Sequence, residues 1–321
     1  MKAEDVYEKM NLCGKLGIPF LFGIDFEEEN GFFRENPLKN SDILFSIGCV
    51  GNYRPPQTVC PKPELTIKSS DFADYQKKFK EVHKGLLYGN TFLLNLTERT
   101  LVDCNLSLSE IFYYSKAKYK LLIPDKFVCF SPESFIQIKD NRISTFPMKG
   151  TADATLPNAE QSLIENYKEK CEHYTIVDLL RNDLNKVAIH VKVDRFRYVE
   201  QIKTIHGEIL QTSSEISGEM PKNWKTDIGN IISKLLPAGS ISGAPKPSTV
   251  HIIKSAEGIS RGYYTGVFGY FDGSTLDSAV MIRYIEKDNG NYYFRSGGGI
   301  TINSKAEEEY QEVLDKIYLS I

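Results

Sequence analysis

Glu133 and Lys149 are the residues of this 321-residue chain whose types and setting first suggest chemistry. They stand at opposite ends of two apolar, β-rich segments joined by Lys139-Asp140-Asn141-Arg142. A three-residue loop that pairs Lys139 with Ile143 would place the carboxylate and the amine across from each other on one face. A two-residue loop would shift the register by one residue and put them on opposite faces. The residues alone leave both registers open.

Two predicted helices each carry a second kind of candidate, a Glu-x-x-Glu pair. Glu169 and Glu172 lie within about 60° of each other on a helical wheel, and Glu309 and Glu312 repeat the spacing near the C-terminus. Such pairs repel along a helix unless a cation compensates them, and four oxygen donors suit Mg²⁺. The alternative is two solvated helix faces.

Three further segments favour anion binding. Residues 237–246 hold two glycines, two serines and two prolines, which predicts a tight loop with exposed N–H groups, although an ordinary connector is equally consistent. Arg283 interrupts an apolar strand and therefore needs a carboxylate partner or a bound anion. Gly297-Gly298-Gly299 would let a ligand approach the backbone closely.

The composition excludes several classes of function. The chain is 41% hydrophobic and 25% charged with a net charge of −3, and no basic block favours nucleic acid. No apolar run approaches the roughly 20 residues of a membrane helix, and the start does not resemble a signal peptide. Six scattered cysteines without a C-x-x-C predict reduced thiols, so we expect a cytoplasmic protein.

The elements that must position these residues follow from periodicity. Residues 1–65 predict short strands and turns, with Glu27 to Glu29 as a solvated turn. Capping boxes are expected at Ser107 with Glu110 and at Ser304 with Glu307. The other expected helices and strands are helices at 71–87, 158–180, 227–236 and after 304, and strands at 91–96, 187–193, 196–202, 264–271, 278–285 and 292–296.

Four motifs resemble those of the chorismate-utilising enzymes, which include anthranilate synthase component I, aminodeoxychorismate synthase component I, isochorismate synthases and salicylate synthases. Together they span residues 131–316 in the family's order. They are Pro147-Met148-Lys149-Gly150-Thr151, Glu172 with residues 176–184, residues 237–246, and Gly297-Gly298-Gly299-Ile300 with Glu309, Glu312 and Lys316.

The resemblance implies an α/β fold of the α+β type, in which two largely antiparallel sheets pack together with helices on the outside. It also implies a single chorismate-binding domain over residues 1–321, with a weakly matching N-terminal portion (about 1–65) and a catalytic core (66–321). In that fold, Glu172 and Glu312 would hold Mg²⁺ on the ring carboxylate of chorismate, with Glu169 and Glu309 reaching the metal directly or through water. The implied substrate-binding residues are Arg283 and Tyr264 at the enolpyruvyl carboxylate and, around the rest of the pocket, Lys316, Ser242, Gly243, Gly297 and Gly299.

Lys149 separates the members of the family. Aminodeoxychorismate synthases resemble Pro-Ile-Lys-Gly-Thr at this motif and anthranilate synthases Pro-Ile-Ala-Gly-Thr. The lysine implies that unprotonated Lys149 attacks C2 of chorismate while Glu133 protonates the departing C4 hydroxyl, after which ammonia adds at C4. Since acid and nucleophile must share a face, we expect the three-residue loop or a compensating bulge near Pro132 or Pro147.

The chain departs from the family pattern at two positions. Leu93 stands where amine-adding relatives often have glutamine and water-adding relatives a lysine base, which argues against isochorismate or salicylate formation. Gln211 stands where anthranilate synthases have a histidine, and the nearby His206 is off the motif. The N-terminal part of the chain has no Leu-Leu-Glu-Ser-type segment, so tryptophan binding is not expected.

We therefore predict an aminodeoxychorismate synthase component I of p-aminobenzoate and folate biosynthesis. No Cys-His-Glu amidotransferase pattern is evident in the chain, so a separate glutamine amidotransferase subunit is the expected source of ammonia. The alternatives are anthranilate synthase component I and a non-catalytic chorismate-binding subunit.

Overall fold

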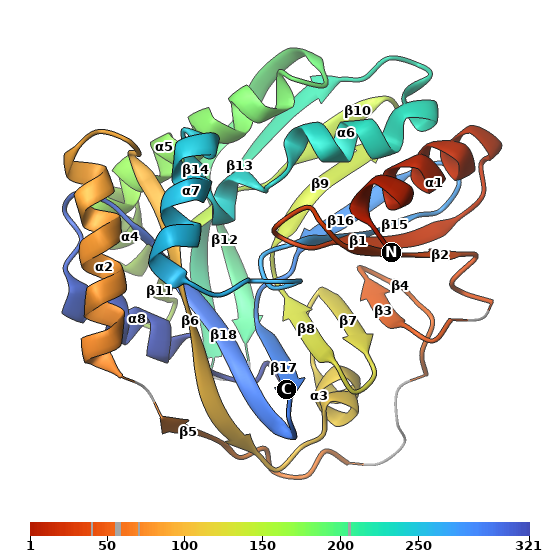
Figure 1. Cartoon of the computed structure of the whole chain (residues 1–321). Helices are drawn as coiled ribbons and strands as arrows, with labels where there is room; N and C mark the ends of the chain where they lie inside the picture. Colours follow the sequence, from red (N-terminus) through yellow and green to blue (C-terminus); the bar gives the residue numbers. More distant parts are fainter. Residues whose placement is uncertain (40, 55–58, 70, 205–206) are drawn as a thin grey trace.

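Two antiparallel sheets packed face to face form the body of the molecule (Figure 1). The structure is a computed structural model that describes residues 1–39, 41–54, 59–69, 71–204 and 207–321. His206 lies outside these residues. The α+β class with two packed sheets and helices outside is thereby confirmed.

In the described part of the chain each sheet has nine strands. The first runs in the order β11 (Met148–Asp153), β13 (Gly207–Glu219), β10 (Arg142–Thr145), β9 (Ser134–Lys139), β16 (Leu276–Val280), β15 (Val267–Phe271), β1 (Phe20–Ile24), β2 (Gly31–Glu35), with β12 (Ile189–Thr204) also beside β13. The second runs β14 (Gly243–Ala244), β6 (Leu93–Cys104), β18 (Asn291–Ile300), β17 (Tyr284–Asp288), β8 (Phe127–Ser131), β7 (Tyr119–Ile123), β3 (Leu44–Ile47), β4 (Val50–Gly51), with β5 (Leu65–Ser69) also beside β6.

The helices lie on the outside of the sheets (Figure 1). Helix α1 packs on α6 and on β1 and β2, α2 packs on α7, α8 and β6, and α5 packs on β13. Their bounds are α1 (Ala3–Leu16), α2 (Phe72–Leu87), α3 (Leu108–Tyr114), α4 (Ala159–Glu165), α5 (Tyr167–Leu184), α6 (Ile228–Leu235), α7 (Lys246–Glu257) and α8 (Ala306–Asp315), with 3₁₀ turns η1 (Trp224–Asp227) and η2 (Gly239–Ile241). No helix in the described residues is both long and apolar enough to cross a membrane.

In strand β1, apolar and polar residues do not alternate, because all five residues are buried. Phe20, Phe22 and Ile24 join the core under α1, whereas Leu21 joins the cluster between the two sheets. A strand that is buried on both faces reads as a continuous apolar run. The N-terminal residues thus enter both sheets, since β1 and β2 belong to one and β3 and β4 to the other.

Helix α1 was missed in the sequence. Val6, Met10 and Cys13 recur at helical spacing and are buried, which is the signal that predicts this helix. Residues 1–65 taken together have a turn-rich composition, which favoured short strands and turns over a helix of this length. The solvated turn at Glu27 was also wrong in part, because its carboxylate accepts hydrogen bonds from the N–H groups of Arg261 and Gly262 at 2.9 and 3.0 Å.

Of the two expected alternatives, the three-residue loop is wrong. Lys139 pairs with Arg142, so the loop is the two residues Asp140 and Asn141. Both have positive φ (50° and 57°), which Asp and Asn tolerate and which matches the twist of a two-residue hairpin turn. The chain then leaves β10, and Lys149 lies on β11, which pairs with β13 and not with β9. An irregularity between Lys149 and Thr151, close to Pro147, interrupts that pairing.

The helix expected over residues 158–180 is two helices, α4 and α5. Asn166 separates them, and its side chain accepts a hydrogen bond from the Glu169 N–H at 3.0 Å. Of the two apolar lines, the one with Ile176 is buried, and the one with Tyr174 faces solvent over most of its length.

Of the two capping boxes expected from the sequence, one is present. The capping box of Ser107 and Glu110 is confirmed. The box at Ser304 and Glu307 is wrong, because Lys305 is the N-cap of α8 and the Ser304 hydroxyl instead donates to Glu309 at 2.7 Å.

The expected strand over residues 278–285 is two strands, with a break that includes Arg283. Strand β16 ends at Val280 in the first sheet, and β17 begins at Tyr284 in the second. Arg283 lies in the crossover with φ of 53°, a backbone conformation uncommon for a residue with a side chain. It therefore lies where the two sheets meet, which is where the pocket opens.

Candidate active site

One pocket with a volume of about 460 Å³ gathers every site residue expected from the sequence. Its walls come from both sheets, from α5 and α8, and from the loop between α6 and β14. Thirteen expected residues line it, namely Glu133, Lys149, Glu169, Glu172, Ser242, Gly243, Tyr264, Arg283, Gly297, Gly299, Glu309, Glu312 and Lys316. This size suits a small-molecule ligand.

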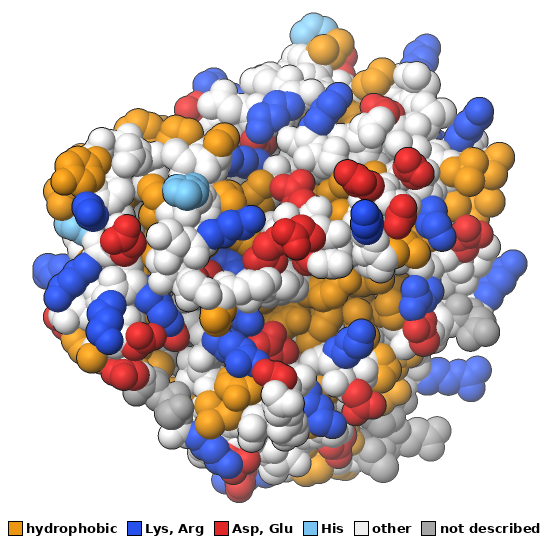
Figure 2. Space-filling view, viewed as in Figure 1, with side chains coloured by type: hydrophobic (Ala, Val, Ile, Leu, Met, Phe, Trp, Pro, Cys, Tyr) orange, Lys and Arg blue, Asp and Glu red, His pale blue; other side chains and the backbone are white. Residues whose placement is uncertain are grey.

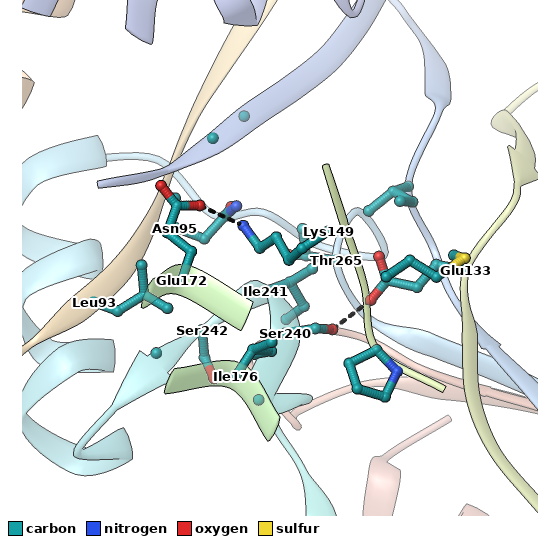
Figure 3. A pocket seen from close by; sticks show the side chains of 18 of the residues that line it. Leu93, Asn95, Glu133, Lys149, Glu172, Ile176, Ser240, Ile241, Ser242 and Thr265 are labelled. Carbon is teal, nitrogen blue, oxygen red and sulfur yellow. Dashed lines mark hydrogen bonds and ion pairs between the residues drawn. The ribbon is translucent and has the colours of Figure 1, made fainter. Parts of the chain in front are cut away.

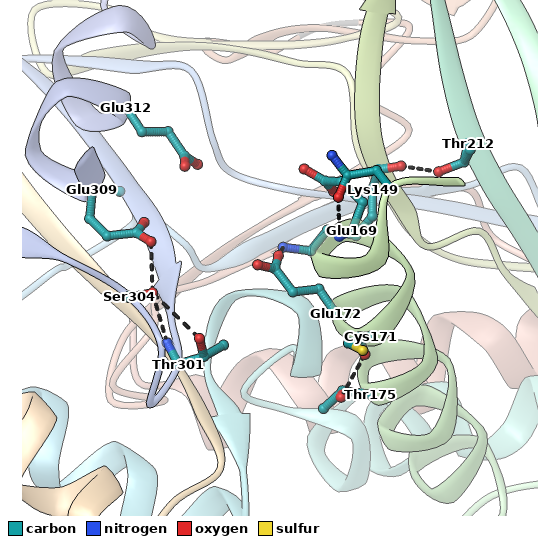
Figure 4. A network of polar contacts seen from close by, with 12 residues as sticks. Lys149, Glu169, Cys171, Glu172, Thr175, Thr212, Thr301, Ser304, Glu309 and Glu312 are labelled. Atoms are coloured by element: carbon teal, nitrogen blue, oxygen red, sulfur yellow. Dashed lines mark hydrogen bonds and ion pairs between the residues drawn. The ribbon is translucent and has the colours of Figure 1, made fainter. Parts of the chain in front are cut away.

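The two Glu-x-x-Glu pairs face each other from α5 and α8 (Figure 4). In each pair, the second glutamate contacts a lysine. Lys149 Nζ lies 3.2 Å from Glu172 Oε2, and Lys316 Nζ lies 2.6 Å from Glu312 Oε1 and 2.8 Å from the Gly297 carbonyl. Glu309 is buried and takes its hydrogen bond from Ser304. All four carboxylates line the pocket, although their exposure differs: Glu309 is buried, whereas the side chain of Glu312 is 47% exposed.

The triple glycine on β18 makes room for these carboxylates. A Cβ at Gly298 would lie 3.4 Å from Glu309 Oε2 and 3.5 Å from Glu312 Oε1. A Cβ at Gly299 would lie 3.6 Å from Lys149 Nζ and 3.3 Å from a methyl group of Leu93. The space left by the missing side chains is thus bordered by acidic oxygens and by the lysine amine.

The donor set of this wall fits a hard divalent cation. The pocket is lined by the carboxylates of Glu133, Glu169, Glu172, Glu309 and Glu312 against three cationic side chains, so acidic groups are in excess. Mg²⁺ prefers such oxygens and keeps several waters, so one or two carboxylates suffice. As they stand, no three His, Cys, Asp or Glu side chains within the described ranges are close enough to form a metal site. Glu172 and Glu312, one from each helix, are the carboxylates that could hold such an ion.

Lys149 is held at the irregular part of β11. The Thr212 hydroxyl donates to its backbone carbonyl, and its side chain is 27% exposed toward the pocket. Burial lowers the pKa of the amine, but the carboxylates of Glu172, Glu169 and Glu312 together raise it, and the net pKa lies above the ordinary lysine value. The amine is therefore an ammonium in this arrangement and must lose a proton before it can act as a nucleophile.

Glu133 lies between β8 and β9, on a different wall from Lys149 (Figure 3). Its carboxylate accepts a hydrogen bond from the Ser240 hydroxyl at 2.5 Å rather than from Lys149. Burial raises its pKa, while Ser240 and the cations Lys149, Arg283 and Lys316 lower it, with a net rise. A carboxyl group whose pKa is raised is suited to act as a general acid.

Arg283 and Tyr264 in the pocket wall could hold an anion. The Nε of Arg283 is buried and has no hydrogen-bond partner among the described residues, as expected for an arginine that awaits an anion. Tyr264 is buried beside it, and burial raises the pKa of its phenol to about 12, so the group is a hydroxyl donor at neutral pH. Thr265 next to it has φ of 60°, an outlier for a β-branched residue.

The loop of residues 237–246 lines the pocket as the glycine and serine content suggested. Gly243 has φ of 137°, and a Cβ there would fall 1.9 Å from the Leu93 carbonyl, so only glycine allows β14 to pair with β6. Behind the loop, Arg261 is 1% exposed, is paired with Glu257 at 2.6 Å, and donates to the carbonyls of Ile241 and Asn95. This buried network ties the loop to β6.

Sequence reasoning missed four pocket or supporting residues. Ser240 was read as part of a loop rather than as the partner of an acid, and Asn95, Thr265 and Arg261 carried no pattern of their own. The available signal was position, because Arg261 and Thr265 flank Tyr264. Leu93 and Gln211, the two departures from the family pattern, both line the pocket.

On the face of the molecule seen in Figure 2, Lys and Arg side chains alternate with Asp and Glu, without a large area of one sign. This face therefore shows no strongly basic or acidic area.

Comparison with known proteins identifies the family of this chain. A family model described as chorismate binding enzyme matches residues 34–320. The chain belongs to this family. A PabA-like protein of Haemophilus influenzae is 52% identical over 324 residues, which cover 98% of this chain and 96% of that protein.

Relatives with named activities are more distant members of the chorismate binding enzyme family. Aminodeoxychorismate synthase component 1 of Bacillus subtilis is 30% identical over 76% of this chain, and anthranilate synthase component 1 of Mycolicibacterium smegmatis is 34% identical over 62%. The matches cover 54% and 40% of those two proteins, so the chain spans about half of their length or less. The crystal structure of anthranilate synthase component I from Streptococcus pneumoniae has the same fold, with a TM-score of 0.67, 24% identity, and coverage of 80% of this chain and 59% of that one.

Proposed function

We propose that this chain is an aminodeoxychorismate synthase component I, which aminates chorismate to 4-amino-4-deoxychorismate with ammonia from a separate glutamine amidotransferase in the cytoplasm. The observation that carries the proposal is Lys149, whose amine lies inside the pocket beside Glu172 and across from Glu133. A lysine at this motif resembles aminodeoxychorismate synthases, whereas anthranilate synthases have alanine there.

The chain's own groups divide the reaction into two steps. The neutral Lys149 amine forms a bond to C2 of chorismate as the C4 hydroxyl, protonated by Glu133, leaves as water. Ammonia then forms a bond at C4, the bond from C2 to Lys149 breaks, and 4-amino-4-deoxychorismate is released. The overall balance is chorismate plus ammonia to product plus water. Glu172 lies within reach of the Lys149 ammonium to accept its proton before attack.

The remaining residues bind and orient the substrate. Arg283 and Tyr264 would hold the enolpyruvyl carboxylate, since the arginine has an unpartnered Nε there. Lys316, Ser242, Gly243, Gly297 and Gly299 would line the ring. Glu172 and Glu312, assisted by Glu169 and Glu309, would hold Mg²⁺, which when bound neutralises the ring carboxylate.

Mass spectrometry of the intact protein tests the nucleophile. We expect incubation with chorismate and Mg²⁺, without ammonia, to add the mass of chorismate minus water, and we expect Lys149→Ala to abolish the adduct. Lys305→Ala, which removes an exposed lysine, is the matched control and should retain it. An adduct on another residue would overturn the role of Lys149.

Product analysis tests the reaction itself. With chorismate, Mg²⁺ and ammonium, we expect 4-amino-4-deoxychorismate. Anthranilate and pyruvate would instead identify an anthranilate synthase component I. Tight chorismate binding with no turnover would identify a non-catalytic subunit.

A further inference from the structure

Ser240 contacts the carboxyl group of Glu133 although 107 positions separate the two residues. Its hydroxyl donates to Glu133 Oε1 at 2.5 Å, the short end of the range for O–H···O hydrogen bonds (Figure 3). Ser240 comes from η2 in the loop between α6 and β14, whereas Glu133 precedes β9 in the first sheet. The contact therefore joins two walls of the pocket.

The position of Ser240 is fixed from both sides. The Ser242 hydroxyl donates to the Ala238 carbonyl at 2.8 Å, and Arg261 donates to the Ile241 carbonyl at 3.1 Å. Arg261 is itself held by the buried Glu257. The chain on both sides of Ser240 is thus held by hydrogen bonds within the protein.

The backbone of Glu133 is equally constrained. Its N–H donates to the Ser131 hydroxyl at 3.1 Å and its carbonyl accepts from the Val280 N–H at 3.2 Å. With the backbone fixed and Oε1 engaged by Ser240, the rotation of the carboxyl group is restricted. Oε2 is then the oxygen left for the reacting molecule.

We propose that Ser240 is a positioning residue for the acid of the reaction. Its hydroxyl holds Oε1 of Glu133, directs the proton carried by Oε2 toward the leaving hydroxyl, and stabilises the carboxylate that remains once the proton has left. The inference rests on the proposed role of Glu133 as the acid. Hydrogen bonds to a charged group are stronger than those to a neutral one, so the contact is strongest after proton transfer.

The surroundings of Glu133 set the sign of the expected pH effect. Burial opposes its charged form, and Ser240, Lys149, Arg283 and Lys316 favour it. Loss of the Ser240 hydrogen bond should raise the pKa of Glu133 further. A step that needs the protonated acid slows as the pH rises through this pKa, so the falling limb of the pH profile should move to higher pH in Ser240→Ala.

Steady-state kinetics of chorismate consumption test the proposal. We expect Ser240→Ala to lower kcat about 10- to 100-fold, the range for a lost hydrogen bond to a charged group, with KM nearly unchanged. Ser240→Thr, which keeps the hydroxyl, should recover most of the rate. Ser233→Ala removes a hydroxyl from the neighbouring helix α6 and is the matched control.

A double-mutant cycle separates positioning from a structural role. If Ser240 acts through Glu133, Ser240→Ala should have little further effect in a Glu133→Gln background. The proposal is overturned if Ser240→Ala lowers the rate equally in both backgrounds. It is also overturned if Ser240→Ala keeps both the wild-type rate and the wild-type position of the falling limb of the pH profile. Consumption is scored whatever the product, so an unexpected product defeats the proposed function and leaves this test intact.

A measurement without turnover provides a second readout. In protein with ¹³C-labelled glutamate carboxyl groups, the Glu133 resonance is assigned by its absence in Glu133→Gln. Its titration midpoint should move to higher pH in Ser240→Ala and stay in place in Ser233→Ala. An unmoved midpoint in Ser240→Ala contradicts the contact.

Discussion

At the scale of single residues, the group proposed as the acid of the reaction lowers the stability of the fold. Glu133 is held where burial opposes its charge, and its pKa is raised above the ordinary glutamate value. Between the unfolded and the folded pKa, the folded protein binds more protons than the unfolded chain. The stability of the fold therefore falls as the pH rises through that interval and is lowest above the folded pKa.

Glu133→Gln should relieve this cost. The amide keeps an oxygen for the Ser240 hydroxyl and carries no charge, so we expect a higher melting temperature than wild type at about pH 8. The two melting temperatures should converge as the pH approaches the unfolded pKa of about 4.3. Thermal unfolding followed by circular dichroism across this range measures the difference. Glu81→Gln, at an exposed position of α2, should show no such pH-dependent gain.

The same residue scale shows what the sequence could and could not predict about the site. All thirteen expected residues line the pocket, and most of them belong to the motifs of the resemblance, which have fixed residue types at fixed spacing. The partners of those residues were not predicted. Lys149 contacts Glu172 and Glu133 contacts Ser240, through pairs 23 and 107 positions apart that no local pattern connects.

At the scale of elements, helix α5 shows the limit of periodicity. Its sequence has two apolar lines, and both satisfy a helical repeat. Only the line with Ile176 faces the core, while Tyr174 is 53% exposed. Helical periodicity identifies an apolar face, but it does not tell whether another element packs against that face. In the hairpin, likewise, β-propensity predicted the strands, but the turn residues Asp140 and Asn141 decided the register.

The two faces of α5 should differ in their response to truncation. Ile176 is 2% exposed and packed in the main core, so Ile176→Ala should lower the free energy of unfolding by about 2 to 5 kcal/mol. Tyr174→Ala, two positions earlier, should cost about 1 kcal/mol or less, since its main contact is the ring of the half-exposed Phe196. Urea unfolding of both variants compares them directly. Equal losses would mean that the exposed line is covered in solution.

At the scale of the whole molecule, the pocket exists because the chain changes sheets. Strands β16 and β17 belong to different sheets, and Arg283 lies in the crossover between them. The sequence favoured one continuous strand there, since the apolar residues on both sides of Arg283 continue without a turn signal. Its positive φ and its buried Nε without a hydrogen-bond partner are the features that the proposed binding of an anion by Arg283 would explain.

The charge balance of the whole pocket leads to a test of the metal. Helices α5 and α8 bring four carboxylates into the pocket, where Lys149 pairs with Glu172 and Lys316 pairs with Glu312. A ligand that binds the folded state alone stabilises it, by about 2.7 kcal/mol at 100 times its Kd. We therefore expect Mg²⁺ to raise the melting temperature of the wild-type protein and EDTA to reverse the rise.

The variants then locate the ion. Glu172→Gln and Glu312→Gln each remove the charge of a proposed ligand, so each should lose most of the Mg²⁺-dependent rise in melting temperature. Glu81→Gln makes the same chemical change at an exposed position and should keep it. A full rise in either pocket variant would place the ion elsewhere. Because this readout is the stability of the fold and not turnover, it separates loss of the metal from loss of the acid or of the nucleophile.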